Sequence, residues 1–149
     1  MSPVYELSSE LSLPRPHQEV FEFFSNAKNL EILTPKWLHF EILTPEPIDL
    51  RAGTLIDYRL RLRGVPIHWR SEITVWEPPV RFVDEQRKGP YRVWIHEHRF
   101  EERAGSTQVI DQVRYDHFGG WVVNRLFVAR DLEKVFTFRR RKLLEIFGS

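Results

Sequence analysis

Residues 82–100 read FVDEQRKGPYRVWIHEHRF, and their pattern predicts two β-strands joined by a turn at 87–90. Side chains alternate between the two faces of a strand. In an antiparallel pair closed by this turn, one face carries Phe82, Asp84, Gln86, Trp94, His96, His98 and Phe100. A face that combines aromatic rings, imidazoles, an amide and a carboxylate is typical of the wall of a partly polar cavity.

Similar strand-like runs fill most of the chain. Apolar and polar residues alternate along 4–13, which predicts a half-buried strand. Clusters of proline and glycine separate the runs by short connections, which favours an antiparallel meander. The predicted strands are 4–13, 38–43, 54–62, 67–76, 80–86, 91–100 and 107–117.

Helical periodicity appears at both ends of the chain. Apolar residues recur at helical spacing over 17–27, and 30–33 predicts a second short helix before Pro35. No glycine or proline interrupts 121–147, so a long terminal helix follows the last strand. Its expected apolar row, interrupted by Arg139, is Val128, Leu132, Val135, Leu143 and Ile146.

This order of elements predicts an α+β fold in one domain spanning 1–149. A single long amphipathic helix covers only the concave side of a strongly curved sheet, so we expect a seven-stranded antiparallel sheet wrapped around the C-terminal helix. Two short helices follow the first strand. A helix held by a curved sheet does not fill the whole concave space, and the geometry therefore favours a cavity between them.

Composition excludes several classes of protein. The chain has 22 Lys and Arg against 21 Asp and Glu and no cysteine. Balanced charge gives no reason to expect nucleic acid as a partner, and the absence of cysteine excludes disulfides and thiolate metal sites. No apolar run reaches the roughly 20 residues of a membrane span, and the N-terminal residues lack the basic and apolar regions expected of a signal peptide. We expect a cytoplasmic monomer or weak homodimer without membrane insertion.

Three segments resemble a known superfamily. They are PHQEVFEFFSNAKNLEILTP at 16–35, FVDEQRKGPYRVWIHEHRFEE at 82–102 and DQVRY at 111–115. The chain resembles the SRPBCC superfamily, whose helix-grip fold is shared by START lipid-transfer domains, aromatic polyketide cyclases and the major birch-pollen allergen. The last two segments look like the bacterial ligand-binding SRPBCC or cyclase/dehydrase-like group.

The resemblance carries expectations about function. Members bind, carry or cyclise hydrophobic small molecules in the cavity, and some are enzymes while many only bind. The resemblance also implies a cavity mouth formed by 63–66, 87–91 and 118–122. Gly119 and Gly120 there would let the following apolar segment move over a ligand.

The strongest candidates for chemistry are His98, Asp111 and Tyr115. A turn near 104–106 sets His98 across from Asp111 on the cavity side, and a carboxylate that holds one imidazole nitrogen leaves the other free as a general base. Tyr115 would then polarise a substrate carbonyl. The alternative is that Asp111 and His98 only satisfy one another within a polar patch of the core.

Other residues on the same face are candidates for ligand binding. Asp84, Gln86 and His96 would orient a ligand, and the apolar wall would comprise Tyr58, Trp69, Phe82, Trp94, Phe100 and Val113. Ordinary core filling explains these aromatic residues equally well. His96 and His98 with Asp84 or Asp111 also fit a metal site, but no dedicated metal spacing occurs, so we expect neither metal nor cofactor.

The basic run 139–142 predicts a solvated helix face, because consecutive helical residues point in different directions. Arg139 lies closest to the apolar row, and we expect it to pair with Asp111 or Glu97. The leading functional hypothesis is non-covalent binding of a hydrophobic or amphipathic small molecule. The alternatives are a cyclase or dehydratase acting on an aromatic or polyketide-like substrate through the His98–Asp111 pair, and a protein-interaction domain with a filled core.

Overall fold

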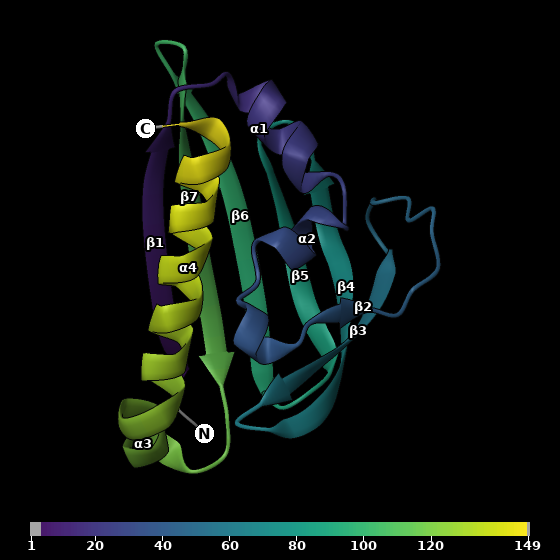
Figure 1. Ribbon diagram of the computed structural model, residues 1–149, viewed down its shortest axis with the longest axis vertical. Helices are drawn as coiled ribbons and strands as arrows, with labels where there is room; N and C mark the ends of the chain where they lie inside the picture. Colours follow the sequence, from purple (N-terminus) through teal and green to yellow (C-terminus); the bar gives the residue numbers. More distant parts are fainter. Residues whose placement is uncertain (1–3, 149) are drawn as a thin grey trace.

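The computed structural model describes residues 4–148 and contains one seven-stranded antiparallel sheet. The strands are arranged in the order β1-β7-β6-β5-β4-β3-β2 (Figure 1). Their bounds are β1 Tyr5–Leu13, β2 Glu41–Ile42, β3 Leu55–Leu62, β4 Val65–Glu77, β5 Arg81–Lys88, β6 Val93–Arg103 and β7 Ser106–Asp116. The helices are α1 His17–Phe24, α2 Asn29–Ile32, η1 Lys36–Leu38, α3 Gly120–Val123, η2 Asn124–Val128 and α4 Ala129–Phe147.

The predicted α+β helix-grip architecture is confirmed. Figure 1 shows α4 running along β1 and β7, with α1 and α2 beside it on the same side of the curved sheet, and α1 contacts β6 and β7. The first and last strands of the chain pair with one another, from Tyr5 opposite Tyr115 to Leu13 opposite Thr107. None of the helices within 4–148 is long and apolar enough to span a membrane.

Two tight hairpins set the register of the sheet. Arg63 and Gly64 both have positive φ, as do Ala104 and Gly105. Two consecutive residues with positive φ form the two-residue turn whose twist matches that of paired strands. The flanking residues Leu62 and Val65 therefore pair directly, so β4 begins at Val65 and not at residue 67 as predicted.

The prediction of a strand over 38–43 is largely wrong. Only Glu41 and Ile42 pair with β3, because a 3-10 turn, η1, follows Pro35 and His39 adopts a left-handed conformation with φ of 48°. Proline starts helical turns readily, since its φ is fixed near the helical value. The segment thus bends across the end of the sheet before it can extend.

The long terminal helix is confirmed but not regular. A π-helical turn, η2, separates α3 from α4. The predicted apolar row is partly wrong, because Ile146 is 40% exposed and Val135 is only half-buried. The buried face steps by three or four residues through Leu132, Phe136, Arg139, Leu143 and Phe147, so it includes the arginine that was expected to interrupt it.

Aromatic side chains fill both ends of the concave side. Near α1, Phe21, Phe24, Phe82 and Phe100 pack against Leu143 and Phe147 in one cluster. At the other end Trp69 packs edge to face against Tyr91 and Trp94, and Trp94 lies at a tilt against Tyr91 and Tyr115. The polar residues of β5, β6 and β7 lie between these two aromatic ends.

The buried face of α4 gives a direct stability prediction. Leu143 is 1% exposed, and its replacement by alanine should lower the free energy of unfolding by roughly 2 to 5 kcal/mol through lost contacts and a cavity. Ile146→Ala, one turn along on the exposed side, should cost less than about 1 kcal/mol. Urea denaturation measures both, and equal losses would contradict this orientation of the helix.

Candidate functional site

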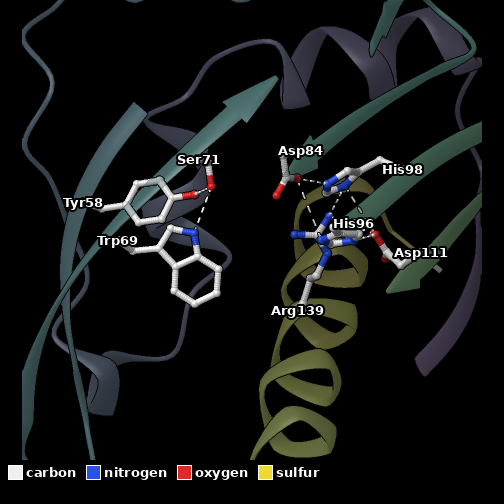
Figure 2. Close-up of polar contacts among 8 residues, drawn as sticks. All are labelled: Tyr58, Trp69, Ser71, Asp84, His96, His98, Asp111 and Arg139. Carbon is white, nitrogen blue, oxygen red and sulfur yellow. Dashed lines mark hydrogen bonds and ion pairs between the residues drawn. The ribbon is translucent and has the colours of Figure 1, made fainter. Parts of the chain in front are cut away.

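The face predicted from 82–100 exists as expected. Phe82 pairs with His98, Asp84 with His96, and His98 with Asp111 across three adjacent strands. Figure 2 shows Asp84, His96, His98 and Asp111 on one side of the sheet, with Arg139 reaching them from α4. Buried titratable groups from three strands and a helix therefore meet at one place.

Within this cluster, however, the hydrogen bonds run diagonally. His98 Nε2 lies 2.6 Å from Asp84 Oδ2, and His96 Nε2 lies 2.8 Å from Asp111 Oδ1. The two rings stack with centroids 3.6 Å apart. The predicted His98–Asp111 pair is correct in register, but its nearest atoms are 3.4 Å apart. Diagonal neighbours lie within reach of long side chains, so strand register alone does not define the partner.

Arg139 fixes the proton positions in the cluster. Its Nη2 lies 3.2 Å from His98 Nδ1 and 3.3 Å from Asp111 Oδ1. A guanidinium only donates, so Nδ1 accepts and the single proton of a neutral His98 sits on Nε2. That proton is donated to Asp84 Oδ2, which is therefore the acceptor. The expected pairing of Arg139 with Asp111 is confirmed, whereas Glu97 binds Arg81.

The environment shifts the two carboxyl groups in opposite directions. Burial raises the pKa of Asp84 from its usual value. Burial also acts on Asp111, but the charge of Arg139 and the hydrogen bond from His96 outweigh it and hold its pKa well below the usual range. Burial, together with the charges of His96 and Arg139, lowers the pKa of His98, which is therefore neutral near pH 7. Asp111 is the fixed anion, and Asp84 is the carboxyl group that can change its protonation.

A small cavity borders this cluster on one side. Its walls come from the α1–α2 segment, β3, β4, β5, β6 and α4, and its volume is about 60 Å³. The empty space that these walls border, open solvent included, is about 530 Å³. The lining residues are Phe23, Phe24, Asn26, Ala27, Asn29, Leu30, Leu33, Leu50, Ile56, Tyr58, Ser71, Ile73, Phe82, Asp84, His98 and Arg139.

A second polar group faces the cluster across the cavity. The Tyr58 hydroxyl lies 2.5 Å from Ser71 Oγ, and Trp69 Nε1 donates to the same Ser71 oxygen at 3.0 Å. Tyr58 and Ser71 line the cavity, and Figure 2 shows them opposite Asp84 and Arg139. The mainly apolar cavity thus has polar groups at two sides.

Four of the predicted site residues line this cavity, namely Tyr58, Phe82, Asp84 and His98. Trp69 and His96 lie directly behind it through their bonds to Ser71 and Asp111. The others pack elsewhere: Gln86 bonds the backbone of Tyr91, Tyr115 donates to Asn124, Trp94 joins the aromatic end, Phe100 packs against Phe21 and Phe24, and Val113 packs near α4.

The predicted mouth does not border this cavity. None of the residues in 63–66, 87–91 and 118–122 lines it, because the aromatic side chains of Tyr91, Trp94 and Trp69 fill that end. The apolar segment expected to cover a ligand is instead exposed, with Trp121 at 65%. The α1–α2 segment contributes Asn26, Asn29 and Leu30 to the cavity wall.

Ser71 was not among the predicted site residues, and Arg139 was expected to have only a structural role. The strand pattern contained a signal for Ser71, since Trp69, Ser71 and Ile73 alternate onto one face of β4. No sequence pattern placed the α1–α2 segment on the cavity, because that contact depends on how the chain returns across the sheet.

The cluster has the composition of a metal site but not its electrostatics. Asp84, His96 and His98 each offer a ligand atom within 4.8 Å of the others. The permanent charge of Arg139 lies in contact with His98, and hydrogen bonds to carboxylates already use one nitrogen of each imidazole. A divalent cation here would face a guanidinium at close range. These residues are therefore better suited to binding and sharing protons than to binding a metal ion.

Comparison with known proteins agrees with this fold. The sequence model of the family described as "Polyketide cyclase / dehydrase and lipid transport" matches residues 13–143. The chain belongs to this family. The SRPBCC resemblance of the three sequence segments is thereby confirmed. No curated protein matches the chain.

Solved structures share the fold of this polyketide cyclase/dehydrase and lipid transport family member at low identity. The Zhui aromatase/cyclase from Streptomyces sp. R1128 has a TM-score of 0.74 at 14% identity, covering 96% of this chain and 93% of that one. Major latex-like protein 151 from Panax ginseng has a TM-score of 0.71 at 9% identity, covering 98% of this chain and 99% of that one. A protein from Thermus thermophilus has a TM-score of 0.68 at 16% identity, covering 97% of this chain and 94% of that one. Family and fold make the chain a small-molecule-binding SRPBCC domain or cyclase-like protein.

Replacement by asparagine should affect stability differently at Asp111 and at Asp84. Asp111→Asn removes the partner of a buried arginine and should lower the free energy of unfolding by roughly 3 to 5 kcal/mol at pH 7. Asp84→Asn removes a carboxylate whose ionisation burial opposes, so stability at pH 7 should stay the same or rise.

The pH dependence of stability tests the same assignment. A raised folded pKa means that ionisation of Asp84 costs stability as pH rises through that pKa. The advantage of Asp84→Asn should therefore shrink as pH falls and Asp84 in the wild type takes up its proton. Thermal melts between pH 7 and 4 measure this. A loss of stability in Asp84→Asn as large as that in Asp111→Asn would refute the assignment.

Proposed function

We propose that this chain binds a small, largely apolar molecule in the cavity between the sheet, the α1–α2 segment and α4. The observation that carries the proposal is a mainly apolar cavity into which Asp84, His98 and Arg139 bring polar groups from one side. Apolar walls supply affinity, and a few converging polar groups fix orientation. The Tyr58–Ser71 pair adds polar contacts from the opposite side.

The size of the cavity limits what it holds in this conformation. A volume of about 60 Å³ has room for a few water molecules, whereas a cavity of about 150 Å³ accommodates benzene. Typical ligand pockets measure roughly 300 to 1,000 Å³. Binding of an organic molecule therefore requires the walls to move apart. The α1–α2 side is the weakest wall, because α2 has only four residues and none of them is buried.

Native mass spectrometry of the gently purified chain tests the proposal directly. We expect a stoichiometric apolar adduct, either carried through purification or taken up from a panel of fatty acids, sterols and aromatic compounds. Ala27→Leu adds side-chain volume at the cavity wall and should weaken binding at least tenfold, because the added carbons occupy ligand space.

A matched change serves as the control for this experiment. Ala52→Leu makes the same substitution in the exposed β2–β3 connection and should leave binding unchanged. An adduct that persists in Ala27→Leu would place the ligand elsewhere. A wild-type chain that takes up nothing from the panel would favour the alternative of an interaction domain with a filled core.

A second function is favoured by the position of Asp84 on the cavity wall. Its carboxylate accepts from His98 at 2.6 Å and has a raised pKa, both of which suit a group that removes a proton from carbon. In this reaction Asp84 takes a proton from the carbon beside a ketone, and the electron pair moves to the carbonyl oxygen. The resulting enolate oxygen would accept hydrogen bonds from the donors that line the cavity.

Deuterium exchange tests this second function. Cyclohexanone in D2O should exchange its α-protons faster with the wild-type chain than without it, as followed by proton NMR. Asp84→Asn should lower the enzymatic rate by roughly 10² to 10⁴-fold. Glu85→Gln neutralises the neighbouring carboxylate on the opposite face of β5 and should have no effect. Equal rates for wild type and Asp84→Asn would show that Asp84 does not catalyse this proton transfer, and only the binding function would remain.

A further inference from the structure

The Tyr58–Ser71–Trp69 group has one hydroxyl proton that its own hydrogen bonds do not use. Trp69 donates to Ser71 Oγ, and a single hydrogen bond joins the Ser71 and Tyr58 hydroxyls. That bond uses only one of the two hydroxyl protons, and neither hydroxyl donates elsewhere within 4–148. Burial raises the pKa of Tyr58, so its hydroxyl stays protonated. Because Tyr58 and Ser71 both line the cavity, the spare O–H is available to a molecule inside it.

Arg139 offers further donors on the facing side. Its Nη2 is engaged by His98 and Asp111, but its buried Nε has no hydrogen-bond partner in the described chain. The residue is 6% exposed and lines the cavity. Figure 2 shows a guanidinium nitrogen pointing toward the side of the cavity where Tyr58 and Ser71 lie. The guanidinium nitrogens that bind neither His98 nor Asp111 are left to donate to a ligand oxygen.

Asp84 presents an acceptor at the same place. Its side chain keeps 17% of its surface exposed, against 5 to 8% for the imidazoles and Asp111. Since Arg139 places the proton of His98 on Nε2, Asp84 Oδ2 is the acceptor of that hydrogen bond. Asp84 and Ser71 lie on the same sheet face, because Ser71 is two residues before Ile73, which pairs with Asp84. Such diagonal neighbours are roughly 7 to 8 Å apart, which leaves room for one oxygen between the side chains.

We propose that the polar part of the cavity selects a hydroxyl group on an otherwise apolar ligand, a phenol or an alcohol. The ligand O–H donates to Asp84, and its oxygen accepts from the spare Tyr58–Ser71 proton and from Arg139. The proposal rests on the binding function proposed above and names the chemical class of its ligand.

Other polar groups fit this arrangement less well. A ketone or aldehyde oxygen satisfies the donors but places its lone pairs against the Asp84 carboxylate. A ligand carboxylate adds like-charge repulsion to the same mismatch, and an ammonium group pairs with Asp84 but leaves the Tyr58–Ser71 proton unused. Among these groups only a hydroxyl both donates and accepts through one small atom.

Three probes of similar shape separate these cases. p-Cresol and p-xylene differ by a hydroxyl in place of a methyl group, and p-tolualdehyde carries a carbonyl in its place. Dissociation constants come from NMR titration of the full chain. We expect p-cresol to bind the wild type about tenfold more tightly than p-tolualdehyde, the factor for one charge-assisted hydrogen bond.

Asp84→Asn should reverse this preference. The asparagine Oδ1 can accept from His98 Nε2, which turns the Nδ2 donor toward the cavity. Binding of p-cresol should then weaken about tenfold and that of p-tolualdehyde should strengthen, while p-xylene changes less than about twofold. Glu85→Gln, on the opposite face of β5, should leave all three constants unchanged.

The outcomes separate this inference from the binding function. If all three probes bind and Asp84→Asn alters them equally, the cavity binds ligands but does not select a hydroxyl. A wild type that prefers p-tolualdehyde would also overturn the inference. If none of the probes binds, the proposed binding function fails, and the hydroxyl selection fails with it.

Discussion

The buried ion pair between Arg139 and Asp111 holds the functional face of the sheet and the long helix together. A guanidinium in the core is tolerated only when its charge is matched by a nearby countercharge. Asp111 on β7 supplies the charge, and His98 on β6 supplies a second acceptor. This requirement fixes where the middle of α4 packs on the sheet. Phe136 and Leu143 are buried on either side of Arg139.

The same ion pair organises the protons around it. Because Arg139 can only donate, it sets the tautomer of His98 and thereby makes Asp84 an acceptor at the cavity wall. Two aspartates on the same sheet face therefore differ in role. Asp111 is held ionised by its partners, while Asp84 lacks a comparable countercharge and can exchange its proton. Pairs of carboxyl groups with pKa values pushed apart are a recurrent feature of functional sites.

Aromatic packing determines where a ligand has access. Tyr91 and Trp94 fill the end of the concave side that the family resemblance suggested as the mouth, and the small cavity remains beside the α1–α2 segment. Structures at 9 to 16% identity share the architecture but carry no information on these side chains. What this member of the family binds follows from its own lining residues, and above all from the polar groups facing one another across the cavity.

Local sequence patterns were enough to predict most of the elements, the antiparallel meander around a long helix, and the face on which Phe82, Asp84, His96 and His98 lie. These features follow from short-range periodicity and from turns such as Gly89-Pro90, which act over a few residues. Even the pairing of His98 opposite Asp111 was predictable, because a two-residue turn fixes the register of β6 and β7.

The partners that these residues bind and the position of the cavity depend instead on tertiary packing. The diagonal bonds His98–Asp84 and His96–Asp111 require sheet twist, ring stacking and the position of Arg139 on a distant helix. Ser71 and the α1–α2 segment reach the site from parts of the chain far apart in sequence, and local patterns do not encode such contacts.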